Sequence, residues 1–104
     1  MNQFDDETIF HIITDDEWRL YEISGVIEPT SLQTEGFVHC STVIQVPITI
    51  GRYYRDRQDL RVVQIAVSRL TSELRWEESH PGEFFPHVFG PIPIAAIVGK
   101  YPLD

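Results

Sequence analysis

Residues 36–42, which read GFVHCST, carry the side chains with the clearest potential for chemistry. Alternation along a short strand places Phe37, His39 and Ser41 on one face and Val38 and Cys40 on the other. His39 therefore points where Ser41 points, and it cannot serve as a base for Cys40. We interpret Cys40 as a small buried hydrophobic residue rather than a nucleophile.

Thr42 follows this strand, and Gln45 three residues later completes the pattern of a capping box. In such a box, side chains satisfy amide donors that the start of a helix leaves unpaired. Free amides, the positive end of the helix dipole and His39 would then be directed at one place, as in phosphate-binding turns. The junction predicts either an anion site or, more simply, a capped helix beside a half-buried histidine.

Three histidines lie in strand-like stretches among apolar residues, namely His11, His39 and His87, whereas His80 is expected at the surface. An imidazole can hold a ribose hydroxyl, an amide or a metal ion, so three converging histidines would form a site. Taken singly, each is more simply explained as a core histidine hydrogen-bonded to a neighbouring hydroxyl or carbonyl group.

A zinc site would need three or four ligands, and the candidates are His11, His39, His87, Cys40 and Glu77. Their spacing gives no support, because the sequence has no C-x-x-C, H-x-x-x-H or H-E-x-x-H motif. We therefore assign no metal. Glu77 follows Trp76, and a carboxylate beside a buried aromatic ring can have an altered pKa and face a pocket. Alternatively, Glu77 lies on the solvent face of a strand.

The net charge of −8, from 16 acidic and eight basic residues, disfavours binding of long nucleic acids. Arg52 is the arginine that a helix could direct inward, toward a phosphate group. The single cysteine, the acidic start and the lack of an apolar run of about 20 residues predict a cytoplasmic protein without a membrane segment. A chain of 104 residues is expected to form one domain over residues 1–104.

The first of the elements that must position these side chains is the segment of residues 8–14. Both faces of this segment are mostly apolar, which predicts a central strand covered on both sides. Thr14 and Glu17 form a capping box that opens a short helix. This helix is expected to bury Trp18 and Tyr21.

Pro47 lies within the next helical stretch and would remove a hydrogen bond from the middle of a continuous helix. A turn over residues 43–46, followed by a helix with Pro47 near its first position and Tyr54 near its last, avoids this cost. Residues 60–67 then predict a second well-buried strand.

Farther along the chain, residues 74–77 predict a short strand and residues 78–83 an exposed loop. The aromatic and proline-rich residues 84–91 are expected to line a site, and residues 94–98 to form the last strand. With two or three short helices in the first half, the pattern predicts an α+β domain on a small curved or split, mostly antiparallel sheet.

The combination of IFHIIT, EGFVHCST and FPHVFGP, at residues 9–14, 35–42 and 85–91, closely resembles the bacterial and plant family called domain of unknown function 952. Asp59-Leu60 and Trp76-Glu77 belong to the same pattern, which covers nearly the whole chain. The family has no established activity.

The order of strands and histidines more distantly resembles the core of ADP-ribosyltransferases, especially the RNA 2'-phosphotransferase branch. The resemblance implies that NAD is the cofactor and that His11 and His39 contact the ribose next to nicotinamide. Ser41 would shape the pocket, and the glutamate of many transferases has no clear counterpart, with Glu77 or His87 as candidates. The basic RNA-binding part of the phosphotransferases is missing, which makes an RNA substrate doubtful.

The leading hypothesis is therefore a small-molecule or nucleotide site that binds NAD or an ADP-ribose-like ligand, with transfer or removal of ADP-ribose as the chemistry. The expected catalytic residues are His11, His39, Glu77 and His87. The expected cofactor-binding residues are His11, Thr14, His39, Ser41, Thr42, Arg52, Phe89 and Gly90. The alternatives are a non-catalytic domain that binds a small molecule or anion, a structural domain with a vestigial cleft, and a metal-dependent hydrolase.

Overall fold

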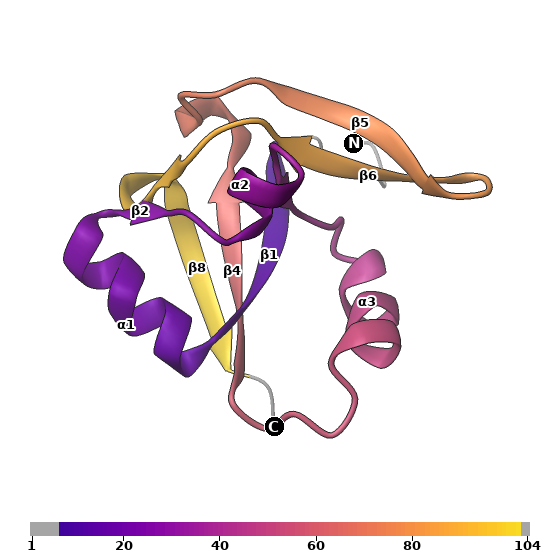
Figure 1. Cartoon of the computed structure of the whole chain (residues 1–104), viewed down its shortest axis with the longest axis horizontal. Helices are drawn as coiled ribbons and strands as arrows, with labels where there is room; N and C mark the ends of the chain where they lie inside the picture. The colour runs from indigo at the N-terminus through magenta and orange to yellow at the C-terminus, as the bar shows by residue number, and fades with distance from the viewer. Residues whose placement is uncertain (1–6, 103–104) are drawn as a thin grey trace.

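The computed structural model describes residues 7–102, and its main sheet has three antiparallel strands. β4 (Leu60–Ala66) lies in the centre, with β1 (Thr8–Thr14) on one side and β8 (Ile97–Pro102) on the other (Figure 1). The expectation that residues 8–14 form the central strand is therefore wrong. β4 holds that position because it pairs with β1 along one edge and with β8 along the other.

The apolar residues on both faces of β1 have a different cause, which is that this strand separates two hydrophobic clusters. Ile9 and Ile13 belong to the larger cluster, whereas Ile12 belongs to a smaller cluster with Val46 of the third helix. A strand buried on both faces shows a nearly continuous apolar run whether or not it lies in the centre of its sheet.

A second sheet consists of β3 (Val38–His39), β6 (Glu83–Val88) and β5 (Leu74–His80), with β6 in the centre. In this sheet His39 lies directly opposite His87. One isolated bridge joins the two sheets: Phe10 N donates to Ser41 O at 2.8 Å, and Ser41 N donates to Phe10 O at 2.7 Å. This connection brings the histidine of β1 close to those of β3 and β6.

The predicted exposed loop at residues 78–83 is a tight hairpin instead. β5 continues to His80, the chain turns at Pro81 and Gly82, and β6 begins at Glu83. Gly82 has a φ of 77°, a left-handed conformation that glycine adopts at little cost. The prediction failed because β5 is an edge strand with many exposed side chains, and its polar residues resemble those of a loop.

The first helix, α1 (Asp15–Ser24), agrees with the sequence analysis. Both hydrogen bonds of the predicted capping box between Thr14 and Glu17 are present, and the helix buries Trp18 and Tyr21. The local signals were sufficient here because the box and the apolar side of the helix lie within a few residues of each other.

Two further helices follow, α2 (Ser31–Thr34) and α3 (Gln45–Tyr53). Thr42 and Gln45 exchange the predicted hydrogen bonds, Thr42 N to Gln45 Oε1 at 3.0 Å and Gln45 N to Thr42 Oγ1 at 3.2 Å. Pro47 lies in the first turn of α3, where its missing N–H removes no helical hydrogen bond.

The remaining elements complete a small α+β fold. Within residues 7–102 it has three α-helices, in agreement with the expected two or three, and every strand pair is antiparallel. β2 (Val26–Ile27) pairs with β7 (Ile92–Pro93). The last strand begins later than predicted, because residues 94–96 form a 3₁₀ turn before β8. No helix within residues 7–102 is long and apolar enough to cross a membrane.

Candidate functional site

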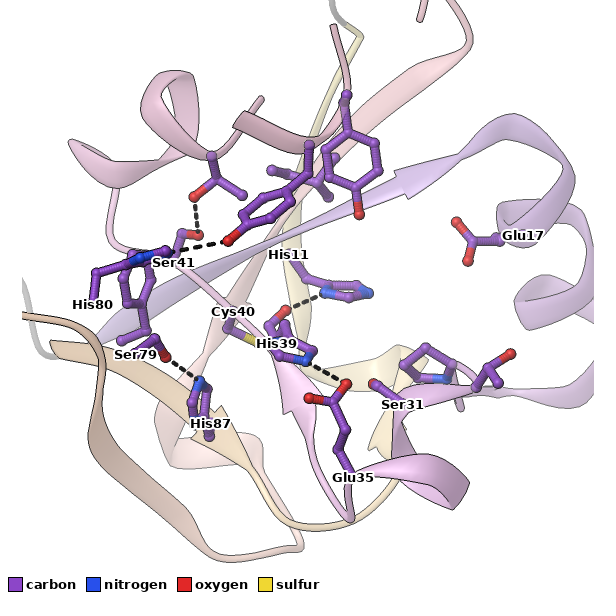
Figure 2. Close-up of a pocket in the computed structure, with 17 residues that line it drawn as sticks. His11, Glu17, Ser31, Glu35, His39, Cys40, Ser41, Ser79, His80 and His87 are labelled. Carbon is purple, nitrogen blue, oxygen red and sulfur yellow. Dashed lines mark hydrogen bonds and ion pairs between the residues drawn. The ribbon is translucent and has the colours of Figure 1, made fainter. Parts of the chain in front are cut away.

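A pocket of about 670 Å³ lies between β1, the segment that leads into α3, α3 itself and the β5–β6 hairpin (Figure 2). Its size is within the range of small-molecule sites, which is about 300–1,000 Å³. All four histidines of the chain line it: His11, His39, His80 and His87. The expected convergence of three strand histidines is therefore observed, and His80, which was expected at the surface, joins them.

His11 is held in one orientation by the backbone of β3. Its Nδ1 donates a hydrogen bond to the carbonyl oxygen of His39, at 2.6 Å. Its Nε2 is the only buried side-chain nitrogen or oxygen without a hydrogen-bond partner in the part of the chain that the structure describes. Burial lowers the pKa of His11, an effect that the bond to the His39 carbonyl opposes only in part. At neutral pH His11 is thus an uncharged imidazole whose Nε2 is a free acceptor.

His39 lies on the more accessible side of the pocket. Its Nε2 pairs with Glu35 Oε2 at 3.0 Å, and about half of each side chain is exposed. The ring also contacts Phe37, with 4.6 Å between centroids. Glu35 stands four residues before His39, just after α2, so the turn between them places a carboxylate at the pocket.

His87 is buried and has partners on both ring nitrogens. Its Nδ1 lies 2.8 Å from Glu77 Oε1, and its Nε2 lies 3.4 Å from Ser79 Oγ (Figure 2 shows the second contact). Phe37 stacks on the imidazole ring, with 4.0 Å between centroids. Glu77 does not line the pocket itself and reaches it only through His87.

Ser41 and Cys40 line the pocket together with His11. Ser41 is buried, and its Oγ lies 3.4 Å from the hydroxyl of Thr49 on α3. Cys40 is also buried, and burial raises the pKa of its thiol well above the ordinary value. The interpretation of Cys40 as a small buried residue is confirmed, although the structure places it in the pocket wall.

The charged lining of the pocket is acidic. Glu17 and Glu35 line it, and no lysine or arginine within residues 7–102 does so. Aromatic rings complete the wall, with Tyr53 at the end of α3, Tyr54 directly after it and Phe85 from β6. Burial also raises the pKa of Tyr54, so its hydroxyl remains protonated at neutral pH.

His80 and Tyr53 connect two walls of the pocket. Tyr53 Oη and His80 Nε2 are 3.1 Å apart, which links the end of α3 to the end of β5. Two other contacts support the same connection, because Arg52 pairs with both oxygens of Glu83 and Gln45 Nε2 donates to the Phe84 carbonyl.

Five of the expected cofactor-binding residues do not line the pocket. Thr14 uses its side chain to cap α1, Thr42 Oγ1 accepts a hydrogen bond from Gln45 N in the turn that leads into α3, and Arg52 pairs with Glu83. Phe89 lies against Phe37 and under the guanidinium group of Arg75. Gly90 follows β6 and packs so closely on Ser72 that an added Cβ would overlap the serine hydroxyl.

The expected anion site at the start of α3 does not form, because the amides that would bind the anion are already occupied. The amides of Thr42 and Gln45 already bind side chains within the capping box. The residues that sequence reasoning missed are Glu17, Glu35, Tyr53, Tyr54, Ser79 and His80. Their polar or aromatic character was visible, but nothing local showed that they share one pocket.

Within residues 7–102, no group of three or more histidine, cysteine, aspartate or glutamate side chains is arranged to hold a metal ion. The histidines are instead spread along the wall, and two of them pair with separate carboxylates.

Comparison with known proteins gives a family but no activity. A family model described as "Protein of unknown function (DUF952)" matches residues 12–100. No curated protein matches. The crystal structure of protein CC0527 from Caulobacter crescentus is similar, with a TM-score of 0.85 and 26% identity over 93% of this chain and 86% of that one. The solution NMR structure of the same protein has a TM-score of 0.80 and 26% identity, over 94% of this chain and 85% of that one.

Proposed function

Because the chain belongs to the family of proteins of unknown function DUF952, whose name assigns no activity, we propose a function from the pocket itself. We propose that the pocket binds NAD⁺ through its nicotinamide riboside end. The observation that carries the proposal is the free acceptor on His11, a buried Nε2 that has no partner within the described residues.

A buried acceptor without a partner costs free energy, on the order of 1–3 kcal/mol, and a ligand that donates a hydrogen bond to it recovers this energy. Ribose hydroxyls and the nicotinamide carboxamide are such donors. Neighbouring side chains cover Nε2 from solvent, so a ligand reaches it when one of them moves aside. Side-chain movements of this kind are common on binding.

The charge of the pocket indicates which end of the dinucleotide enters. A pyrophosphate group is usually held by arginine, lysine or free helix amides. Glu17 and Glu35 instead favour a cationic group, and the oxidised nicotinamide ring is a cation. The aromatic rings of Tyr53, Tyr54 and Phe85 offer surfaces on which a flat ring can stack.

The resemblance to ADP-ribosyltransferases agrees with this choice of ligand and adds a reaction. Cleavage of the bond between nicotinamide and ribose develops positive charge on the sugar, and a carboxylate in the pocket stabilises that charge. Glu35 and Glu17 line the pocket and are suited to this role, whereas the carboxylate of Glu77 lies behind His87. His11 and His39 would hold the ribose.

A second candidate is binding without turnover. It is favoured by the contact of Glu35 Oε2 with His39 Nε2 at 3.0 Å, which occupies one oxygen of the carboxylate that the reaction would use. Both candidates require the ligand to occupy the same pocket, so binding is tested first and release of nicotinamide second.

The test is a thermal-shift titration with NAD⁺, NADH and ADP-ribose. A ligand at 100 times its Kd adds about 2.7 kcal/mol of stability, which raises the Tm of a small domain by several degrees. We expect NAD⁺ to stabilise more than NADH, whose nicotinamide ring is neutral, and more than ADP-ribose, which lacks the ring.

His11→Asn removes the Nε2 position and retains a donor toward the His39 carbonyl, so this variant should fold and lose the NAD⁺ shift. Ser68→Ala, on an exposed residue outside the pocket, is the matched control and should retain it. Equal shifts with all three ligands, or no shift with any, would refute recognition of the nicotinamide end.

A further inference from the structure

We propose that Ser79, His87 and Glu77 form a nucleophilic triad at the edge of the pocket, able to cleave small esters through an acyl-serine intermediate. The inference is independent of the proposed NAD⁺ site, because it makes no use of His11. It assigns an acyl-transfer activity to the same face of the protein.

The distances place the three side chains in series. Glu77 Oε1 lies 2.8 Å from His87 Nδ1, and His87 Nε2 lies 3.4 Å from Ser79 Oγ. An ionised carboxylate only accepts hydrogen bonds, so in a neutral imidazole the proton must be on Nδ1. Nε2 then has a free lone pair, which accepts the hydroxyl proton of Ser79. This is the tautomer that a general base for serine requires.

The strands explain how the series is built. Glu77 and Ser79 are two residues apart on β5, and His87 on the neighbouring strand β6 pairs with Arg75. The His87 ring therefore contacts Glu77 and Ser79 diagonally, since its direct partner across the two strands is Arg75. The pairing register shifts between Glu78 and His80, which makes Ser79 the additional residue of an irregularity in the strand. Such irregularities redirect a side chain and occur often beside active sites.

Neighbouring side chains bury His87, the base, whereas Ser79, the nucleophile, is accessible. The His87 side chain is 5% exposed, and the ring of Phe37 stacks on it at 4.0 Å. Ser79 is exposed and also lines the pocket, so a substrate can reach its hydroxyl. A separation of 3.4 Å is long for a hydrogen bond between oxygen and nitrogen, but nucleophile–base contacts are often looser before substrate binds.

The reaction follows from these positions. Ser79 Oγ attacks the ester carbonyl carbon, and its proton moves to His87 Nε2. The bond from carbon to the leaving oxygen then breaks, and His87 returns the proton to the departing alcohol. Water then attacks the acyl carbon and gives one proton to His87 Nε2. As the bond from the acyl carbon to Ser79 Oγ breaks, His87 returns this proton to Ser79 Oγ, which releases a carboxylic acid and restores the free serine. Glu77 acts as a positioning residue that fixes the tautomer and stabilises the imidazolium form of His87.

The lining of the pocket favours an ester with an apolar acyl or alcohol group. Phe85 and His80, the residue after Ser79, line the pocket, and their rings pack edge to face with 6.2 Å between centroids. These rings favour an apolar group on the substrate, whereas Glu35 disfavours a carboxylate on it.

The test uses a fluorophosphonate probe, which forms a bond from phosphorus to a nucleophilic serine oxygen and releases fluoride. Intact mass spectrometry and peptide mapping should find one adduct, on Ser79, in the wild-type chain and in the control Ser68→Ala. Ser79→Ala should give no adduct. Loss of general-base assistance typically costs about 10²–10⁴-fold, so Glu77→Gln should slow labelling by a factor within that range.

Two further readouts separate positioning from simple structural support. Glu77→Asp should recover part of the rate that Glu77→Gln loses, and the wild-type labelling rate should rise with pH, because a general base must be unprotonated to accept the serine proton. Circular dichroism must show that each variant is folded. Absence of label on Ser79, or equal labelling in Ser68→Ala and Ser79→Ala, would overturn the triad.

Failure of the triad can be distinguished from failure of the NAD⁺ proposal. Ser79→Ala should retain the thermal shift with NAD⁺, and His11→Asn should retain labelling by the fluorophosphonate. If each variant loses only its own activity, the two sites are independent and the triad stands. If Ser79 is not labelled while NAD⁺ still binds, the triad alone is refuted.

Discussion

His11 Nδ1 donates a hydrogen bond to the carbonyl oxygen of His39, at 2.6 Å across 28 positions of sequence. This bond connects β1 to β3 and determines which nitrogen of His11 carries the proton. The other nitrogen is left as a buried acceptor without a partner within the described residues. A structural contact thus creates the chemical feature on which the proposed NAD⁺ site depends.

The contribution of this bond to stability can be measured by comparing His11→Asn with His11→Ala. Both variants remove the ring, but the asparagine amide can still donate to the His39 carbonyl. We expect His11→Asn to be more stable than His11→Ala by about 1 kcal/mol, the usual net value of such a bond. Urea unfolding midpoints would show the difference, and equal midpoints would mean that the bond contributes nothing to stability.

The lowered pKa of His11 makes stability depend on pH. In the unfolded chain His11 takes up a proton near its ordinary pKa of 6.5, whereas in the folded chain it stays neutral to lower pH. Between these two values the unfolded state binds more protons, so stability falls as pH decreases, by at most about 1.4 kcal/mol per pH unit. The contribution is fully present above pH 6.5 and is lost as pH falls toward the folded pKa.

Melting temperatures measured from pH 8 to pH 5 would test this dependence. The wild-type chain should lose more stability over the acidic part of the range than His11→Asn, which has no group that titrates at this position. Parallel curves for the two proteins would show that burial does not lower the pKa of His11.

Cys40 should be unreactive in the folded protein, because its thiol is buried and its raised pKa keeps it protonated. We expect Ellman's reagent at pH 8 to release thionitrobenzoate only after denaturant is added. The endpoint should be one thiol per chain, since Cys40 is the sole cysteine. Rapid reaction without denaturant would contradict the buried position of Cys40 and show that this wall of the pocket opens readily.

The capping box of α1 can be tested with Thr14→Ala. Thr14 Oγ1 accepts a hydrogen bond from Glu17 N at 3.1 Å, and loss of such a cap typically costs about 1 kcal/mol. For a domain near this size that loss lowers the Tm by roughly 4–8 °C. Thr30→Ala is the matched control, because Thr30 precedes α2 without a side-chain capping bond. Equal changes in the two variants would argue against the box.

Two glycines should respond to alanine in opposite directions. Gly51 lies in α3 with open space around the position of a Cβ, so Gly51→Ala should stabilise by about 0.5–1 kcal/mol. Gly90→Ala should destabilise, because the new Cβ would overlap Ser72. Adding Ser72→Gly should restore most of the stability that Gly90→Ala loses. Thermal unfolding of Gly51→Ala, Gly90→Ala and the double variant with Ser72→Gly would test these effects. If Ser72→Gly did not compensate, overlap with Ser72 would not be the cause of the lost stability.

Elements with strong local signals were predictable from the sequence. The helix after Thr14 was identified from its capping box and its buried Trp18 and Tyr21. The strand predicted at residues 60–67 was identified from its apolar run, and the structure has it at Leu60–Ala66. Residues 78–83 were not predictable in this way. Their polar character indicated a loop, whereas pairing with β6 extends β5 to His80 and leaves only Pro81 and Gly82 in the turn.

The residues of the candidate site also divide into those that the sequence could indicate and those that it could not. The sequence pointed to His11, His39, Ser41 and His87 because polar side chains in apolar strands are unusual, and these four do line one pocket. It could not separate them from Thr14, Thr42 and Arg52. Thr14 and Thr42 use their side chains to bind backbone amides three residues ahead, whereas Arg52 forms an ion pair with Glu83, 31 positions away in the sequence.

Sequence alone therefore determined the α+β character, the capped helices and the presence of histidines inside the fold, because each depends on patterns within a few neighbouring residues. Only the tertiary structure decided which nitrogen of His11 is free and that Ser79 lies beside His87. Both relationships depend on how β1, β3, β5 and β6 pair. The pairing register between strands is set by packing across the whole domain, and a change of one residue would turn these side chains to the opposite face.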